Sequence, residues 1–311
     1  MLILGRAEVE RLLDLRAMLD ALERGFRAVS SGAADVPARI AARAPGGLFA
    51  AMPGYLPGTL AAKLVTVFPG NDARGVPSHQ AVILLVDEAV GTPRALLDGT
   101  HITAMRTAGG AAVSVRHLAR PDATVIAILG AGAQGRSHLE VMPLVRDFAE
   151  IRIASRTREH AEALAARHPR AVVADSFAAA VRGADVVCCC TDSHEPVLER
   201  SWLSDGCHVT SVGGTFGPEV DSATVDDARV FVESRAAAVN QPPAGTHELQ
   251  GRDPASMTEL GEVLERTSPG RLDDLELTLY KSMGHAVEDA VTAQLVVDRA
   301  AATGAGVEVP L

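Results

Sequence analysis

With 311 residues, the chain is long enough for two domains and a sizeable buried core, and its 3% aromatic content suits an α/β protein built from small, closely packed elements. The formal net charge of −10 argues against general affinity for nucleic acid, which requires a basic surface. No apolar run reaches transmembrane length and the N-terminal segment MLILGRAEVERLL soon becomes charged, so we expect a cytoplasmic protein that makes no membrane contact.

The N-terminal third begins with a helix and continues with strands. Helical periodicity predicts a helix over residues 14–31, which stops at Gly32. Three strand-like runs and a hairpin follow: ARIAARA, GLFAAMPGYL, LAAKLVTVF and QAVILLVDEAVGTPRALLDG. Residues 100–118 then indicate a helix that links two domains, despite the pair Gly109–Gly110.

Three cations interrupt these otherwise apolar segments: Arg39 in VPARI, Lys63 in LAAKLVTVF and Arg106 in ITAMRTAGG. Charged groups flanked by apolar residues are costly to bury unless they are paired. Each cation alone could instead lie at an edge, with only its stem covered. If the three converge, they form a carboxylate-binding pocket in which arginine clamps and lysine acts as a point charge or proton donor.

A histidine precedes the hairpin in the segment Ser78-His79-Gln80. His79 could act as an acid or base, because its unperturbed pKa lies near neutral pH. A structural or partner-facing histidine is the competing interpretation.

From about residue 120 to 235, strands alternate with helices, which predicts a doubly wound parallel sheet. The predicted strands are 123–129, 151–155, 171–174, 185–190, 207–212 and 229–233. Ligands of such sheets bind at the carboxyl ends of the strands. Those ends are Gly130–Gly135, Ser155–Thr157, Thr191–Ser193 and Gly213–Thr215.

The first of these strand ends carries a glycine-rich turn between a strand and a helix. Gly130, Gly132 and Gly135 have the spacing of the dinucleotide-binding (Rossmann) unit. The following helix, which opens with Ala133 and Gln134, would direct its free N–H groups and positive dipole end toward a pyrophosphate. The competing interpretation is a glycine turn that only helps packing.

The end of the second strand indicates which dinucleotide is bound. An NAD site usually places a carboxylate there to hold the ribose 2′-hydroxyl. This chain has Ser155, Arg156 and Thr157, which can bind a 2′-phosphate through charge-assisted hydrogen bonds, so NADP(H) is favoured over NAD(H). A solvated surface arginine is the alternative.

The four cysteines do not predict a metal site. Cys188, Cys189 and Cys190 are adjacent in a strand-like run, so their side chains face alternately, and neither they nor Cys207 have zinc-site spacing. Buried, apolar-like thiols are expected instead.

The last predicted helix, about Gly284 to Ala302, could pack back against the N-terminal region. This predicts a discontinuous substrate-binding and dimerisation domain, 1–118 with 285–311, around a dinucleotide-binding domain, 119–284. Before that helix, the small residues of Ser282-Met283-Gly284 would let a nicotinamide ring approach closely. A helix N-cap is the alternative there.

Taken together, these pieces resemble the ornithine cyclodeaminase/mu-crystallin family over essentially the whole chain. The matching motifs are VPARI, Met52-Pro53, AAKLVTVFPGN, Ser78-His79-Gln80, Leu97-Asp98-Gly99, ITAMRT through Thr107, the glycine turn, Tyr280-Lys281-Ser282-Met283-Gly284 and Val287-Glu288-Asp289. The resemblance implies a dimer formed through the N-terminal strands and an active site between the two domains. It also implies that Arg39, Lys63 and Arg106 bind the substrate carboxylate. Segment 282–284 is expected near the nicotinamide, with Thr107 and Thr191 also in the cofactor site.

Three departures separate this chain from true ornithine cyclodeaminases. Thr215 replaces an aspartate that handles the substrate amine, Ala50 replaces a glutamate, and Ser155-Arg156-Thr157 lacks the acidic residue that goes with NAD. Without both carboxylates, the second ammonium of a diamino acid has no counter-ion. The resemblance therefore favours the imine-reducing members, with Thr215 in contact with substrate or ribose.

The expected reaction is NADPH-dependent reduction of a cyclic ketimine carboxylate, such as 1-pyrroline-2-carboxylate, to the amino acid. Arg39 and Arg106 would hold the carboxylate, and Lys63 or a water nearby would protonate the imine nitrogen. Alternatives are an alanine or other amino-acid dehydrogenase, ornithine cyclodeaminase itself, and a non-catalytic NADPH-binding protein.

Overall fold

The computed structural model describes residues 1–214 and 216–310, with backbone only at Asp72. The chain divides into two compact units: residues 1–106 with those from 285 onward, and residues 107–284. We call them the first and the second unit. The first boundary falls inside helix α3 (Gly99–Leu118) rather than at its end. The reason is that Ser114 and Leu118 of this helix bond to His208 and Arg271 of the second unit.

The first unit is a mixed seven-stranded sheet. The strand order is β15 (Val307–Glu308), β1 (Leu2–Leu4), β6 (Pro93–Asp98), β5 (His79–Val86), β4 (Thr59–Val67), β3 (Gly47–Leu56) and β2 (Ile40–Ala44). Pairs from β2 to β6 are antiparallel, whereas β1 runs parallel to β6. The predicted strand runs and the hairpin are therefore confirmed. The short strands β1 and β15 were not predicted, because two or three residues carry no periodicity.

Helices α1 (Arg6–Leu12), α2 (Leu15–Ser30) and α10 (Ala286–Thr303) complete the first unit. Asp14 caps α2 by accepting hydrogen bonds from two N–H groups of its first turn, as expected for an N-cap aspartate. A Cβ on Gly25 would lie 3.5 Å from side chains of both Val287 and Val291, so α2 and α10 pack closely there. Helix α10 in turn packs on β3, β4 and β5.

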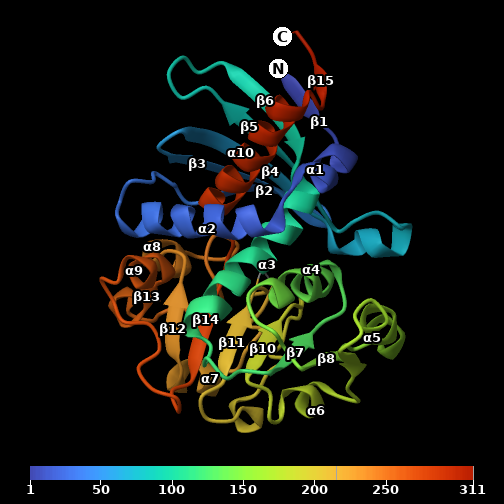
Figure 1. Cartoon of the computed structure of the whole chain (residues 1–311), viewed down its shortest axis with the longest axis vertical. Coiled ribbons are helices and arrows are strands. Elements are labelled where there is room, and N and C mark those ends of the chain that lie inside the picture. Colours follow the sequence, from blue (N-terminus) through green and yellow to red (C-terminus); the bar gives the residue numbers. More distant parts are fainter. Residues whose placement is uncertain (215, 311) are drawn as a thin grey trace. The chain divides into compact units, whose positions relative to one another are not determined.

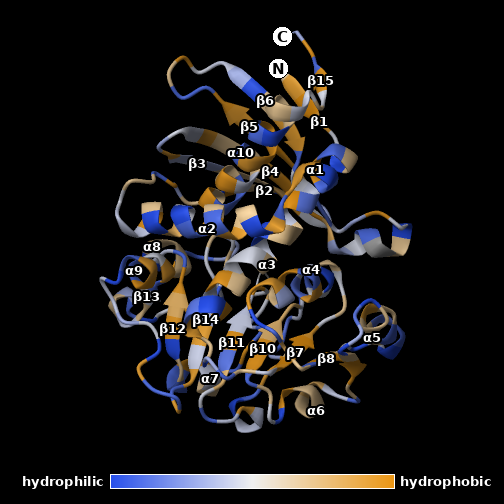
Figure 2. Cartoon of the chain, viewed as in Figure 1, coloured by the Kyte–Doolittle hydropathy of each residue, from blue (hydrophilic) through white to orange (hydrophobic). Residues whose placement is uncertain are grey.

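The second unit is a parallel eight-stranded sheet, which confirms the predicted α/β class with a doubly wound sheet. The strand order is β13 (Thr258–Glu259), β12 (Arg229–Val232), β14 (Thr278–Lys281), β11 (His208–Ser211), β10 (Val186–Cys189), β7 (Val125–Leu129), β8 (Glu150–Ala154) and β9 (Ala171–Val173). Its helices are α4 (Ala133–Val141), α5 (Arg158–Ala165), α6 (Phe177–Val181), α7 (Ser222–Asp227), α8 (Arg235–Ala238) and α9 (Leu260–Glu265). The central strands are buried on both faces, and Figure 2 shows hydrophobic residues along β7 and β12.

All six predicted strands of this sheet are present, but β13 and β14 were not predicted. Figure 1 shows β14, coloured red, between β12 and β11, and it pairs parallel with both. Lys281 therefore ends a buried strand, and the last helix, predicted from about Gly284, begins at Ala286 after the N-cap His285. Among the described residues, none of the helices is both long enough and apolar enough to cross a membrane.

Candidate functional site

The glycine turn follows β7 in the second unit and leaves no room for larger residues at two positions. Gly130 has φ of +111°, and a Cβ there would lie 2.6 Å from the carbonyl oxygen of Cys190. A Cβ on Gly135 would overlap the carbonyl oxygen of Gly130. The chain can therefore make this tight strand-to-helix turn only with glycine at these two positions.

The middle glycine of the turn faces open space. Gly132 is the N-cap of α4, no side chain caps this helix, and a Cβ on Gly132 would meet no atom within 4 Å. Gly132 and Ala133 are exposed and Gln134 is half-buried. The N–H groups of a helix N-terminus favour an anionic ligand, and backbone can approach it closely here. The turn therefore fits the pyrophosphate of a dinucleotide.

The end of β8 carries hydroxyls and a guanidinium rather than a carboxylate. Ser155 and Thr157 are half-buried and Arg156 is exposed, with no hydrogen-bond or ion-pair partner among the described residues. The next arginine differs, because Arg158 already pairs with Glu162 at 2.9 Å and Asp175 at 2.8 Å. Of these two arginines, Arg156 is the one that remains for a phosphate.

Two hydroxyls expected to contact the cofactor are occupied by buried carboxylates of the second unit. The Thr191 hydroxyl donates to Glu219 at 2.8 Å, and the Ser282 hydroxyl donates to Glu233 at 2.6 Å. The backbone N–H of Gly284 also donates to Glu233, at 3.3 Å. Both hydroxyls are therefore held by hydrogen bonds within the protein, which the sequence interpretation did not include. Thr107 is buried on α3 and Met283 is half-buried.

In the first unit, the structure brings two of the three predicted cations together on one carboxylate. Lys63 Nζ on β4 lies 2.8 Å from Asp289 Oδ2 on α10, and Arg106 Nε lies 2.9 Å from Asp289 Oδ1. Arg106 Nη1 also lies 2.9 Å from Glu288 Oε2. All four side chains are at most 4% exposed. The two carboxylates thus hold both cations in fixed orientations.

Burial and neighbouring charges tune this cluster. Burial, followed by repulsion from Arg106, lowers the pKa of Lys63 to about 8, and Arg39 adds to the effect. Burial alone would raise the pKa of Asp289, but attraction to Arg106 and Lys63 outweighs it and lowers that pKa. Arg39 is half-buried, and its positive charge acts on both Lys63 and His285. Cations held in fixed orientations suit a ligand that carries a carboxylate.

His285 is a further member of this cluster. It is 5% exposed, and burial together with Arg39 lowers its pKa to about 4, so the ring is neutral at neutral pH. Sequence reasoning assigned no role to His285, Glu288 or Asp289. The signal was present, because the pair Glu288-Asp289 interrupts an apolar helix as the cations interrupt apolar strands.

Of the other residues singled out in the sequence, Arg39 is half-buried immediately before β2. His79 is exposed at the start of β5, where it pairs with Val67 across the sheet, and its Nδ1 lies 3.3 Å from the Ser78 hydroxyl. Thr215 lies outside the described residues. Lys63 and Lys281 are the only two lysines among the 29 lysine and arginine residues, and both are buried, one in each unit.

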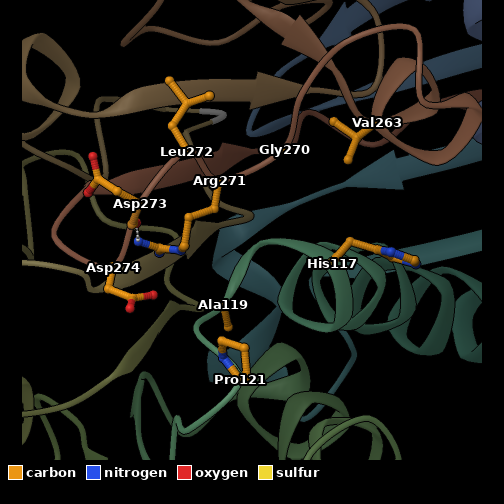
Figure 3. A pocket seen from close by; sticks show the side chains of 9 residues that line it. All are labelled: His117, Ala119, Pro121, Val263, Gly270, Arg271, Leu272, Asp273 and Asp274. Carbon is orange, nitrogen blue, oxygen red and sulfur yellow. Dashed lines mark hydrogen bonds between the residues drawn. The ribbon is translucent and has the colours of Figure 1, made fainter.

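A separate pocket of about 390 Å³ lies near residues 117–121 and 270–274 of the second unit. Figure 3 shows the Arg271 guanidinium pointing toward Asp273, whose carbonyl oxygen accepts a hydrogen bond from it at 3.4 Å. Arg271 also donates to Thr278, the first residue of β14, at 2.9 Å. This pocket is therefore at the amino ends of the strands, opposite to the glycine turn, and is not part of the candidate site.

Comparisons with known proteins agree with this geometry. A model of the ornithine cyclodeaminase/mu-crystallin family matches residues 1–304. The ketimine reductase mu-crystallin of Rattus norvegicus is 39% identical over 257 residues, covering 81% of this chain and 80% of that protein. Thermococcus litoralis Delta(1)-pyrroline-2-carboxylate reductase, solved in complex with NADH and L-proline, superposes with a TM-score of 0.94 at 33% identity and covers 99% of this chain and 100% of its own. An archaeal alanine dehydrogenase dimer with bound NAD superposes with a TM-score of 0.93 at 27% identity, covering 100% of this chain and 99% of its own.

Proposed function

Because the chain belongs to the ornithine cyclodeaminase/mu-crystallin family, we propose that it is an oxidoreductase that uses NADPH to reduce a cyclic ketimine carboxylate, such as 1-pyrroline-2-carboxylate, to the amino acid. The observation that carries the proposal is the buried cluster of Lys63 and Arg106 with Glu288 and Asp289, with the charge of Arg39 acting on Lys63. The names of the rat protein and of the Thermococcus enzyme support an imine substrate.

Arg39 and Arg106 bind the substrate carboxylate in this proposal. The ion pairs to Glu288 and Asp289 fix the Arg106 guanidinium before substrate arrives, so little side-chain entropy is lost on binding. The positive charges of Arg39 and Arg106 attract the substrate carboxylate. A diamino acid would bring a second ammonium, which this cationic site disfavours.

Lys63 supplies the proton. When bound, the reduced nicotinamide provides a hydride to the imine carbon. The Lys63 ammonium gives its proton to the imine nitrogen, so that the C=N bond becomes a C–N bond and both added hydrogens are accounted for. With a pKa of about 8, Lys63 is charged at neutral pH and still a better acid than an ordinary lysine. Asp289 keeps the ammonium oriented at 2.8 Å.

The cofactor is proposed to lie on the second unit, on the glycine turn and the strand ends around it. The proposed cofactor contacts are Thr107, Gly130, Gly132, Ala133, Gln134, Gly135, Ser155, Arg156, Thr157, Thr191, Ser282, Met283 and Gly284. Preference for NADP(H) rests on Arg156 with its flanking hydroxyls, because a carboxylate at this position would repel a 2′-phosphate. The two solved relatives hold NADH and NAD, so the preference is a property proposed for this chain alone.

A homodimer through the sheet of the first unit is also proposed. Lys63 faces α10, so its neighbour Leu64 points to the opposite face of the sheet. There Leu64 pairs across strands with Val82, and Phe49 lies on the adjacent strand, with exposures of 36%, 39% and 46%. Such a contiguous apolar patch marks an interface. If the wild-type protein sediments as a dimer and Leu64→Glu sediments as a monomer, this interface is supported. The cytoplasmic location expected from the sequence stays a prediction.

The test of the reaction is consumption of NADPH with three substrates, namely 1-pyrroline-2-carboxylate, 1-piperideine-2-carboxylate, and pyruvate with ammonia, with NADH in parallel. We expect a cyclic imine to be reduced, with NADPH preferred, and Lys63→Met to lose turnover while still binding NADPH. Turnover of pyruvate with ammonia alone would favour an alanine dehydrogenase, as in the archaeal relative. Release of proline and ammonia from ornithine would refute the proposal in favour of cyclodeamination.

A further inference from the structure

A buried network of charged side chains joins the carboxyl ends of β11 and β14 in the second unit. Lys281 Nζ lies 3.0 Å from Glu248 Oε1, and donates to the Ser211 hydroxyl at 2.8 Å and to the Gly213 carbonyl oxygen at 2.9 Å. The side chains of Lys281 and Glu248 are 0% and 1% exposed. All three ammonium protons therefore have a partner inside the protein.

Glu219 extends the network to the end of β10. Its carboxylate accepts four hydrogen bonds: from the backbone N–H and the hydroxyl of Thr191, at 2.6 and 2.8 Å, from the Ser211 hydroxyl at 2.7 Å, and from the Gly213 N–H at 2.8 Å. The backbone N–H of Glu219 itself donates to Glu248 Oε1 at 2.6 Å. One buried carboxylate thus ties the segment after β10 to the segment after β11.

The backbone is wrapped tightly around these charges. A Cβ on Gly213 would lie 2.7 Å from the Glu219 carboxyl carbon, and one on Gly214 would lie 2.9 Å from Lys281 Nζ. Thr191 in turn adjoins the glycine turn, because a Cβ on Gly130 would lie 3.1 Å from its methyl group. The network therefore sets the shape of two segments at the sheet edge where ligands of this fold bind.

Stability alone does not explain such an arrangement. Replacing a buried ion pair by apolar side chains of similar volume is often neutral or stabilising, because desolvation of both charges is costly. What a fully satisfied polar network does provide is one defined conformation of the groups that it holds. Here those groups are the backbones of Thr191 and Gly213.

We propose that Glu219 is a positioning residue for the dinucleotide: together with Ser211 and Lys281 it holds the Thr191 and Gly213 segments in the conformation that binds the cofactor. The inference rests on the dinucleotide-binding part of the proposed function and not on its imine substrate. Sequence reasoning named Lys281 within a family motif but assigned it no role, although it is a charged residue in an apolar run in the same way as Lys63.

The test compares two serines at opposite ends of β11: Ser211 is the last residue of this strand, and Ser114 of α3 contacts its first residue. Ser211 and Ser114 are both fully buried. The Ser211 hydroxyl joins Lys281 to Glu219, whereas the Ser114 hydroxyl donates to a helix carbonyl at 2.7 Å and lies 3.0 Å from Nε2 of His208, the first residue of β11. Ser211→Ala and Ser114→Ala each remove one hydroxyl, and Glu219→Gln removes the negative charge of the carboxylate that accepts the four hydrogen bonds.

The readouts are the dissociation constant of NADPH, by calorimetry without substrate, and the midpoint of urea unfolding. Ser211→Ala should weaken NADPH binding by about three- to tenfold and Glu219→Gln by about tenfold or more, since hydrogen bonds that orient the binding segments are lost. Ser114→Ala should lower the unfolding midpoint to a similar extent as Ser211→Ala, yet leave NADPH binding within about twofold of wild type.

Wild-type NADPH affinity in Ser211→Ala would overturn the positioning role, and so would an equal loss of affinity in Ser114→Ala, because lost stability would then be the common cause. If Glu219→Gln does not fold, the pair of serine variants still decides. A wild-type protein that binds NADPH but reduces no imine would refute the proposed reaction and leave this inference standing. A wild-type protein that binds no dinucleotide would refute both.

Discussion

The substitution Asp289→Asn should lower the pKa of Lys63 further, and the size of the shift follows from the contacts of Asp289. This carboxylate lies 2.8 Å from Lys63 Nζ in a site where Lys63 is 2% exposed, and its attraction opposes the burial and the repulsion that lower the pKa to about 8. A hydrogen bond to a charged group contributes about 1.5–3 kcal/mol. Since about 1.4 kcal/mol corresponds to one pKa unit, the pKa should fall by about one to two units.

The measurement is direct because the chain has only two lysines. Protein labelled with ¹³C at the lysine ε-carbon should show two lysine resonances, which Lys63→Arg assigns. Titration should place Lys63 near pH 8 in the wild type and near pH 6 to 7 in Asp289→Asn. The alkaline limb of kcat/KM for imine reduction should move with it. Ionisation of the substrate is common to both proteins and cannot produce this difference.

A matched control is Asp185→Asn in the second unit. Asp185 also has an arginine partner, Arg120 at 2.8 Å, and accepts two backbone hydrogen bonds, but it belongs to a different unit from Lys63. The Lys63 resonance should titrate as in the wild type. Titration of wild-type Lys63 near its ordinary 10.5, or an unchanged pKa in folded Asp289→Asn, would refute this account of the cluster.

Three further predictions concern stability and the cofactor. The pKa of Lys63 is about 8 in the folded protein and 10.5 in the unfolded chain, so the unfolded chain binds more protons between these two pH values. The free energy of unfolding, measured by urea titration relative to Lys63→Met, should therefore rise with pH across this window. The slope should be at most about 1.4 kcal/mol per pH unit. Arg156→Ala should weaken NADPH binding about tenfold and leave NADH binding unchanged. Arg167 is another exposed arginine of the same unit, and Arg167→Ala should change neither affinity. Equal losses of affinity for both cofactors in Arg156→Ala would contradict the role of Arg156 in binding the 2′-phosphate. Gly132→Ala should keep wild-type stability, because its Cβ meets no protein atom, but should weaken NADPH binding, because the Cβ fills space proposed for the cofactor. Gly135→Ala should instead lower the midpoint of urea unfolding, because its Cβ clashes with the turn. Unchanged NADPH affinity in Gly132→Ala would place the cofactor elsewhere.

Local patterns were sufficient for much of this protein. Helical periodicity placed the predicted helix at 14–31 close to α2, because a buried stripe repeats within one element, and the helix expected at 100–118 matches α3. The glycine turn between a strand and a helix was equally readable, since the spacing of its three glycines lies within six neighbouring residues. Charged residues in apolar runs marked Lys63 and Arg106 for burial, because burying a charge is costly wherever it occurs.

What surrounds those charges was decided only by the tertiary structure. Asp289 is separated from Arg106 by 183 positions in the chain, and no local pattern tells which carboxylate will meet which cation. The insertion of β14 between β12 and β11 likewise depends on pairing with strands far away in sequence, and it is this insertion that carries Lys281 to Glu248 and Ser211. The sequence alone therefore determined which residues must be buried or must turn, because those are local costs. The partners that satisfy the buried charges depend on how distant segments are brought together.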